Sequence, residues 1–296
     1  MNISKRILLF VLTNLLLIAT FTVIGSFFGV EGYVTESGLN YKHLLIFCTV
    51  YGFLTSGISL ACSRIVAKKF MKIKLINKEE AGNLQWLALM VDDISRRAGL
   101  EVTPEVGVYR SDDMNAFATG PTKKRALVAF SSELLQKMDR AGIEGVAAHE
   151  IAHIQNGDMV TMTLLQAVVN VFVMFLGRVI AYGASSLGKN ESQSRLIWFV
   201  TLIAVQFVLG FLGLIVTGWF SRKREFRADA GSAQLVGASS MIKSLEFLQQ
   251  ENEDEEKAKK LPESMAALGI SGGVKSLFST HPALEIRIEA LRKLGG

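Results

Sequence analysis

Long apolar runs alternate with polar segments along this chain. The first run extends from about residue 7 to 30 without a charged residue, and the second from about 44 to 63. A helix that rises ~1.5 Å per residue can cross ~30 Å of hydrocarbon in either run. Two further runs, at about 159–182 and 196–220, are joined by a short polar loop. The pattern therefore predicts four membrane-spanning helices.

The third run is less regular than the other three because it contains Gln166, Asn170 and Arg178. Polar residues inside a spanning helix face neighbouring helices or a water-filled cavity. The alternative is a helix that packs against the soluble part of the protein or lies in the membrane interface.

Basic residues indicate how the spans are oriented. Lys5 and Arg6 precede the first run, a basic segment at 64–74 follows the second, and another at 222–224 follows the fourth. Because positive flanking residues remain in the cytoplasm, the N-terminus and both polar parts are predicted to be cytoplasmic. This clustering also explains the formal net charge of +5 without a nucleic-acid partner.

The polar part between the second and third runs shows both helical and strand periodicity. Residues 82–99 have helical apolar spacing, and residues 142–156 are predicted to form another helix. Val106 with Val108, and the run 127–130, have the character of short strands. A helix is expected to start near Ser131 or Ser132, either of which is a favourable N-cap residue.

The second of these helices carries the sequence's most informative motif. His149 and His153 are four residues apart, so they lie on one helix face and can bind the same metal ion. Glu150 lies between them, where it could act as a general base toward a water molecule at the metal. Most other positions of this helix are apolar, so buried His and Glu side chains would cost free energy without partners. The motif predicts a zinc-dependent hydrolase.

A catalytic zinc site needs a third protein ligand and one open position. Asn156 and Met159 exclude the metzincin arrangement, which would require Gly and His there. The spacing leaves His281 or a carboxylate as the third ligand. Glu225 and Asp229 are four residues apart, so one could bind metal while the other orients a histidine.

Taken together, these motifs resemble the HtpX family of bacterial membrane metallopeptidases, which are relatives of the CAAX prenyl endopeptidases. The resemblance covers nearly the whole chain. It rests on the apolar runs, 115–118, the stretch 147–153, the segment from Ser221 to Asp229, and 279–282. It implies that Glu225 is the third ligand of one zinc ion per chain. It also implies quality control of damaged membrane proteins, in cooperation with other membrane proteases, in the bacterial inner membrane.

The expected architecture is mainly α-helical, with a cytoplasmic α+β domain of the zincin type (gluzincin) that carries a small sheet. Residues 1–63 would hold two spans and 64–158 the catalytic part with the metal-binding helix. Residues 159–220 would hold two further spans, and 221–296 a cytoplasmic helical part with the third ligand.

Two weaker hypotheses concern substrate binding. Asn115, Ala116, Phe117 and Ala118 could form an edge strand to which a polypeptide substrate adds by backbone hydrogen bonding, although an ordinary hairpin explains them equally well. His281 could stabilise the oxyanion of the transition state, or it could simply precede a helix that starts at Pro282.

Other functions are less consistent with the sequence. The segment 183–189 approaches a phosphate-binding loop, but Asn190 stands where Ser or Thr is needed, so no nucleotide is expected. A membrane scaffold or channel with a structural metal is the main alternative, and such a site would be closed by four protein ligands.

Overall fold

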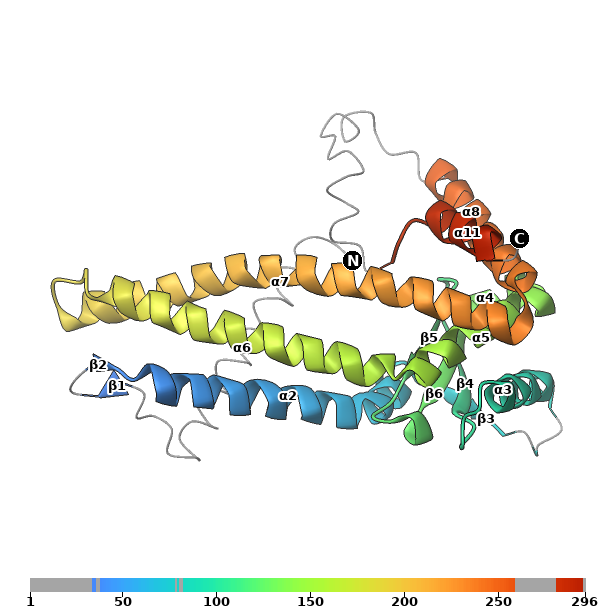
Figure 1. The fold of residues 1–296 in the computed structure, drawn as a ribbon, viewed down its shortest axis with the longest axis horizontal. Coiled ribbons are helices and arrows are strands. Elements are labelled where there is room, and N and C mark those ends of the chain that lie inside the picture. The colour runs from blue at the N-terminus through green and yellow to red at the C-terminus, as the bar shows by residue number, and fades with distance from the viewer. Residues whose placement is uncertain (1–33, 36–37, 78, 80–81, 259–280, 295–296) are drawn as a thin grey trace. The chain divides into compact units, whose positions relative to one another are not determined.

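A computed structural model gives the fold of this chain (Figure 1). It describes residues 34–35, 38–77, 79, 82–258 and 281–294. The first predicted span, at about 7–30, lies outside the described residues. The chain divides into two compact units, each made of two stretches of sequence: residues 1–55 with 167–213, and residues 56–166 with 214–296.

Three long helices contribute to the first unit. They are α2 (Tyr41–Phe70), α6 (Asp158–Ser185) and α7 (Glu191–Val236). The N-terminal half of α2 packs against α6 through a buried cluster that includes Leu44, Tyr51 and Val171. A short hairpin of β1 (Val34–Thr35) and β2 (Gly38–Leu39) precedes α2.

These three helices correspond to the second, third and fourth apolar runs. Each is long and apolar enough to cross a membrane by length and composition, and the apolar windows of α6 and α7 are only 11% buried within the protein. The irregular third run also forms one continuous helix, which has 28 residues. The assignment of membrane-crossing and cytoplasmic parts remains a prediction.

A four-stranded sheet organises the second unit. Its strands are β3 (Lys74–Ile76), β4 (Glu105–Tyr109), β5 (Ala116–Thr119) and β6 (Leu127–Ser131), in the order β3-β4-β6-β5. β4 and β6 are parallel, whereas β3 and β5 pair antiparallel to them at the two edges. The predicted strands β4 and β6 are confirmed. Strand β5 lies at an edge of the sheet and also forms an antiparallel hairpin with β6, so both alternatives for this segment describe it.

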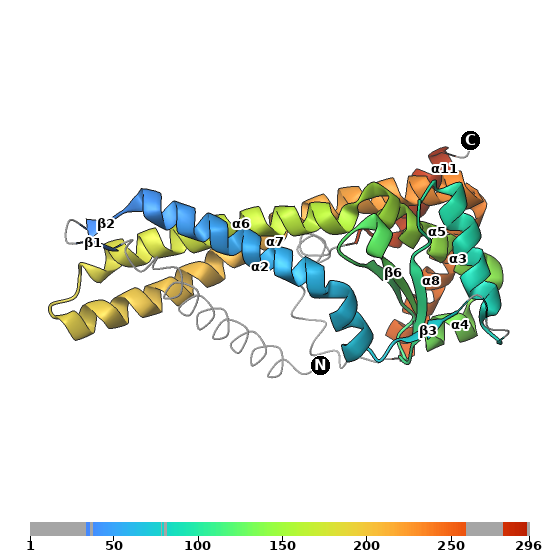
Figure 2. The same cartoon turned by 90° about the horizontal axis from the view of Figure 1, so that it is seen from below.

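Helices α3 and α5 pack together against this sheet (Figure 2). Besides the adjoining parts of α2, α6 and α7, the described residues of this unit form the following helices and 3-10 turn: α3 (Gln85–Arg97), η2 (Lys123–Arg125), α4 (Ser132–Lys137), α5 (Arg140–Asn156), α8 (Ala238–Ala258) and α11 (Leu284–Leu294). The core contains β-branched and aromatic residues of β4 and β6, such as Val128 and Phe130, against Val91 of α3 and Ile151 of α5.

Glycine allows α5 to approach α8 closely. A Cβ atom at Gly145 would lie 2.3 Å from the Ser244 hydroxyl of α8. Ser244 in turn donates a hydrogen bond to the backbone carbonyl of Gly142 at 2.8 Å. Through this contact α8 holds α11 near α5, because α8 and α11 share the buried cluster around Leu245 and Leu291.

Three features differ from the sequence expectation or extend it. The last predicted span lies within α7, which continues beyond residue 220 as one helix of 46 residues. The acidic stretch 249–256, whose charge is typical of a solvated loop or an exposed helix end, forms the end of α8. Strand β3 has only three residues, two of them exposed, so it lacks the alternation that would have revealed it.

Candidate metal centre

Helix α5 places two imidazoles side by side. His149 and His153 lie one turn apart and are each only 7% exposed, although both are polar. The helix begins at Asp139, whose carboxylate accepts a hydrogen bond from the Gly142 amide at 2.7 Å. It ends at Gly157, which has the left-handed conformation (φ 70°, ψ 29°) that glycine adopts without strain.

The third converging group comes from α7, far along the chain. Glu225 is completely buried. Its carboxylate oxygens lie 3.3 Å from His149 Nε2 and 3.4 Å from His153 Nε2. The two Nε2 atoms are 3.1 Å apart. These three side chains form the only group of potential metal ligands found among the described residues.

The separations fit a tetrahedral zinc ion. Bonds of about 2.0–2.2 Å at tetrahedral angles place two ligand atoms roughly 3.3–3.6 Å apart. The separations of 3.1–3.4 Å in this triad are close to that range. Two imidazoles and one carboxylate are also the ligand set of known catalytic zinc sites that keep a fourth position open.

The hydrogen bonds of the imidazoles support the same conclusion. His149 Nδ1 lies 2.9 Å from Asp229 Oδ1, and His153 Nδ1 lies 2.7 Å from Asp158 Oδ2. A carboxylate can only accept hydrogen bonds. Each imidazole, when neutral, therefore carries its hydrogen on Nδ1 and a lone pair on Nε2. Two lone pairs and the Glu225 carboxylate thus point to one place, and only a cation or added protons can satisfy them.

Asp229 is fixed from its other side by Arg287. The Arg287 guanidinium donates to both oxygens of Asp229, at 2.8 Å through Nε and 2.6 Å through Nη2. Both side chains are buried. A bidentate pair of this kind holds the carboxylate in one orientation, so it also fixes the ring of His149.

Asp158 has the corresponding role for His153, and the sequence analysis did not identify it. It is the first residue of α6 and is 1% exposed. Gly157 ends α5 in the left-handed conformation, and the Asp158 carboxylate directly after it lies against His153 of that helix. Arg227 donates to its second oxygen from α7. A left-handed glycine followed directly by an aspartate, just after the motif, is the sequence signal for this contact.

The remaining motif residue, Glu150, is free to react. It is half-buried, and within the described part of the chain no hydrogen bond or ion pair involves its carboxylate. Its charge nevertheless acts on both imidazoles and on Arg287, so it faces the same site.

His281 reaches this site from the segment before α11. Its Nδ1 lies 2.9 Å from Glu225 Oε2, and its side chain remains 61% exposed. The structure therefore brings together five of the predicted side chains from three separate stretches of the sequence: His149, His153, Glu225, Asp229 and His281. Arg287, which the sequence analysis also missed, completes the cluster.

The predicted substrate strand lies beside the metal-binding helix. β5 begins at Ala116 and contacts α5. Asn115 precedes the strand, where its backbone carbonyl accepts from the Ser131 amide at 2.9 Å. The edge position of β5 is confirmed, whereas substrate binding there remains a prediction.

Asp158→Asn is expected to weaken zinc binding about 10–100-fold, as for other outer partners of metal-binding histidines. The amide no longer attracts the Nδ1 hydrogen of His153 as a carboxylate does. Zinc affinity is measured by competition with a chromophoric chelator. Asp139→Ala is the matched control, because it removes a cap of the same helix at a cost of ~1 kcal/mol without touching an imidazole. Equal zinc affinities in the two variants would contradict this assignment.

Zinc affinity is also expected to rise with pH up to about 9. Burial alone would lower the pKa of His149, but hydrogen bonds to Asp229 and Glu225 raise it to about 9. The metal-free imidazole is then protonated at neutral pH, and a ligand must lose that proton to bind. Affinity should increase roughly tenfold per pH unit below pH 9. Calorimetry in buffers of different ionisation enthalpy counts the released protons, and a count of zero at pH 7 would exclude this linkage.

Comparison with known proteins agrees with this geometry. The family model of peptidase family M48 matches residues 82–295. Protease HtpX of Cellvibrio japonicus is 46% identical over 288 residues, which cover 97% of this chain and 98% of the relative. The HtpX homolog of Thiobacillus denitrificans is 47% identical over 293 residues, covering 97% and 99%.

A solved structure shows the same fold. The crystal structure of S. mikatae Ste24p aligns with a TM-score of 0.65 at 19% identity, covering 97% of this chain and 66% of that one. The expected fold class is thereby confirmed: a mainly helical chain with three candidate membrane spans among its described residues and a small zincin-like sheet. The chain belongs to peptidase family M48 and, within it, to the HtpX proteases, which are multi-span membrane metallopeptidases.

Proposed function

We propose that this metallopeptidase cleaves misfolded or damaged membrane proteins at the cytoplasmic face of the bacterial inner membrane, as part of membrane protein quality control. The observation that carries the proposal is the convergence of His149, His153 and Glu225 beside Glu150, which has no hydrogen bond or ion pair with the residues that the structure describes. Apolar helices in the same chain favour substrates that are themselves in the membrane.

One zinc ion per chain would be held by the three converging side chains. When bound, zinc polarises the scissile carbonyl and makes water a nucleophile near neutral pH. The residues around the ligands keep this arrangement rigid. Asp229 and Asp158 hold the two imidazoles by their Nδ1 hydrogens, so that both Nε2 lone pairs stay directed to the metal.

Glu150 would transfer the proton during hydrolysis. Its carboxylate removes a proton from the attacking water and then delivers it to the amine that leaves, as a general base followed by a general acid. Because no other side chain in the described part of the chain binds Glu150, its carboxylate is available for both steps.

Among the basic side chains beside the ligands, His281 would stabilise the charge that develops on the carbonyl oxygen. His281 combines an exposed ring with a hydrogen bond to Glu225, so it can approach a substrate from the solvent side. Arg287 is buried and bound to Asp229, so it acts on the orientation of His149 rather than on the substrate.

A substrate chain would bind as an additional strand on β5. This strand pairs with β6 along one side only, and it contacts the metal-binding helix. Backbone hydrogen bonds to an edge strand make little demand on side chains. Broad specificity for unfolded segments follows from this mode of binding.

The competing proposal is a scaffold or channel with a structural metal, and one experiment separates the two. Detergent-purified full-length protein is incubated with an unfolded membrane protein before chelation, after chelation and after zinc is restored. We expect cleavage that disappears with the chelator and returns with zinc, and slower cleavage of the same substrate when folded. Stoichiometric zinc without any cleavage would favour the scaffold.

A further inference from the structure

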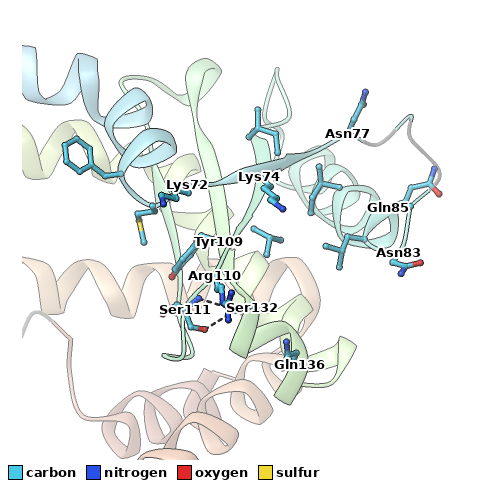
Figure 3. A pocket seen from close by; sticks show the side chains of 17 residues that line it. Lys72, Lys74, Asn77, Asn83, Gln85, Tyr109, Arg110, Ser111, Ser132 and Gln136 are labelled. Atoms are coloured by element: carbon cyan, nitrogen blue, oxygen red, sulfur yellow. Dashed lines mark hydrogen bonds between the residues drawn. The ribbon is translucent and has the colours of Figure 1, made fainter.

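A second concave site lies in the second unit, and none of the candidate metal ligands lines it. It is an open pocket of about 1120 Å³ (Figure 3). Its wall is formed by the end of α2, strand β3, the segment before α3, the end of β4 and the start of α4.

The charge of this pocket has one sign. Among the described residues that line it, the charged ones are Lys72, Lys74 and Arg110, and none is Asp or Glu. All three cations are exposed, and none forms an ion pair with another described residue. By contrast, Arg64 and Lys68 on the preceding turns of α2 are both paired with Glu105. The pocket therefore presents uncompensated positive charge that attracts an anion.

Lys72 occupies a backbone position that favours glycine. It has φ 51°, and it is the only residue other than glycine with a positive φ in the described part of the chain. The Ile73 amide closes the end of α2 by donating to the Lys68 carbonyl at 3.1 Å, which is the arrangement in which glycine usually follows a helix. A lysine in this conformation lowers the stability of the backbone relative to glycine. We therefore expect its side chain to have a function of its own.

The position of the pocket along α2 indicates where the anion comes from. The apolar run of α2 ends near Ser63, and Phe70 is seven residues further, about 10 Å along a helix axis. The pocket thus begins within reach of the phospholipid headgroups. Phe70 is 83% exposed and Leu75 is 50% exposed, so apolar side chains lie at the same site as the cations.

We propose that this pocket binds the headgroup of an anionic phospholipid. The phosphate would be bound by Lys72, Lys74 and Arg110, while Phe70, Met71 and Leu75 contact the upper part of the acyl chains. Ser111, which lies beside Arg110 in the lining, would supply a hydrogen bond to the headgroup. A bound lipid would anchor the sheet of the second unit to the membrane surface beside α2. The proposal does not depend on peptidase activity.

The test uses delipidated full-length protein in an uncharged detergent. Dihexanoyl phosphatidylglycerol is titrated below its micelle concentration, and bound lipid is counted by native mass spectrometry. Dihexanoyl phosphatidylcholine and inorganic phosphate are titrated in parallel. We expect one saturable phosphatidylglycerol site that neither of the other two probes occupies at the same concentration.

Charge-removing variants identify the pocket. Lys72→Gly, Lys74→Gln and Arg110→Gln are each expected to weaken phosphatidylglycerol binding about fivefold, which corresponds to the loss of one cation near an anionic lipid. Lys72→Gly should not lower the lipid-free unfolding temperature, because glycine relieves the left-handed conformation. Lys69→Gln is the matched control: Lys69 is exposed on the same helix end and does not line the pocket.

Three results would overturn the proposal. Equal weakening by Lys69→Gln would indicate general attraction of anionic lipid to a basic surface. Binding of inorganic phosphate as tight as that of phosphatidylglycerol would indicate a site for free anions. Displacement of the lipid by an acidic peptide at lower concentration would assign the pocket to a polypeptide instead.

Discussion

Replacing Glu150 by glutamine is expected to abolish proteolysis while zinc remains bound. The amide has nearly the same shape as the carboxylate, but it cannot take a proton from water or deliver one to the leaving amine. Loss of a general acid-base group lowers the rate about 10²–10⁴-fold. Initial rates of cleavage of an unfolded membrane protein are measured together with the zinc content of each purified sample.

The same helix provides a control for this variant. Glu144 lies on α5 and pairs with Arg97 at 3.3 Å, away from the imidazoles. Glu144→Gln makes the same chemical replacement on the same helix. It should leave the cleavage rate within about twofold of the wild-type rate, because exposed ion pairs contribute little to stability. Cleavage by Glu150→Gln at the wild-type rate would refute the proposed mechanism. Loss of zinc from this variant would show instead that Glu150 helps to hold the metal.

Replacing Glu225 by alanine is expected to remove zinc. Outer partners of metal ligands typically account for roughly 10–100-fold in affinity, and a direct ligand should account for more. Activity should disappear with the metal. The dissociation constant is measured against a chromophoric chelator, and cleavage is measured at several zinc concentrations. Cleavage that returns at high zinc would show that the catalytic groups remain intact.

The burial of Glu225 makes a second measurement necessary. Its carboxylate is completely buried and lies close to His281 and Arg287. Removing one member of a buried charged cluster costs about 3–5 kcal/mol, because its partners remain buried and unpaired. Thermal unfolding in the presence of chelator therefore separates lost stability from lost ligation. Glu246→Ala, which removes an exposed partner of Arg292, is the control. Unchanged zinc affinity in a folded Glu225→Ala protein would assign the third ligand to another residue.

The two active-site aspartates show how differently equivalent contacts appear in a sequence. Asp229 follows Glu225 by one helical turn, so periodicity places both on one face of α7. Asp158 makes the same kind of contact with His153, but it lies beyond the left-handed Gly157 that follows α5. A periodicity argument ends where the helix ends, so it does not predict this contact.

Local residue spacing was sufficient to predict the long helices and the pair of metal-binding histidines. The apolar runs specify helices long enough for a membrane, because length and hydropathy are properties of single segments. The pair His149 and His153 specifies a shared metal ligand position, because one helical turn brings residues four apart together. The resemblance to a family identified Glu225 as the third ligand, whereas spacing alone left His281 or a carboxylate.

Only the tertiary structure decided how distant segments complete the site. Arg287 lies 138 residues from His149 and 58 from Asp229, yet its guanidinium binds Asp229 next to that imidazole. No local pattern encodes such contacts, since they depend on α8 packing on α5 at Gly145 and carrying α11 with it. The pocket beside β3 arises in the same way, from five segments that only folding brings together. Helix periodicity is a local property of the backbone, whereas the orientation of ligands depends on the packing of the whole unit.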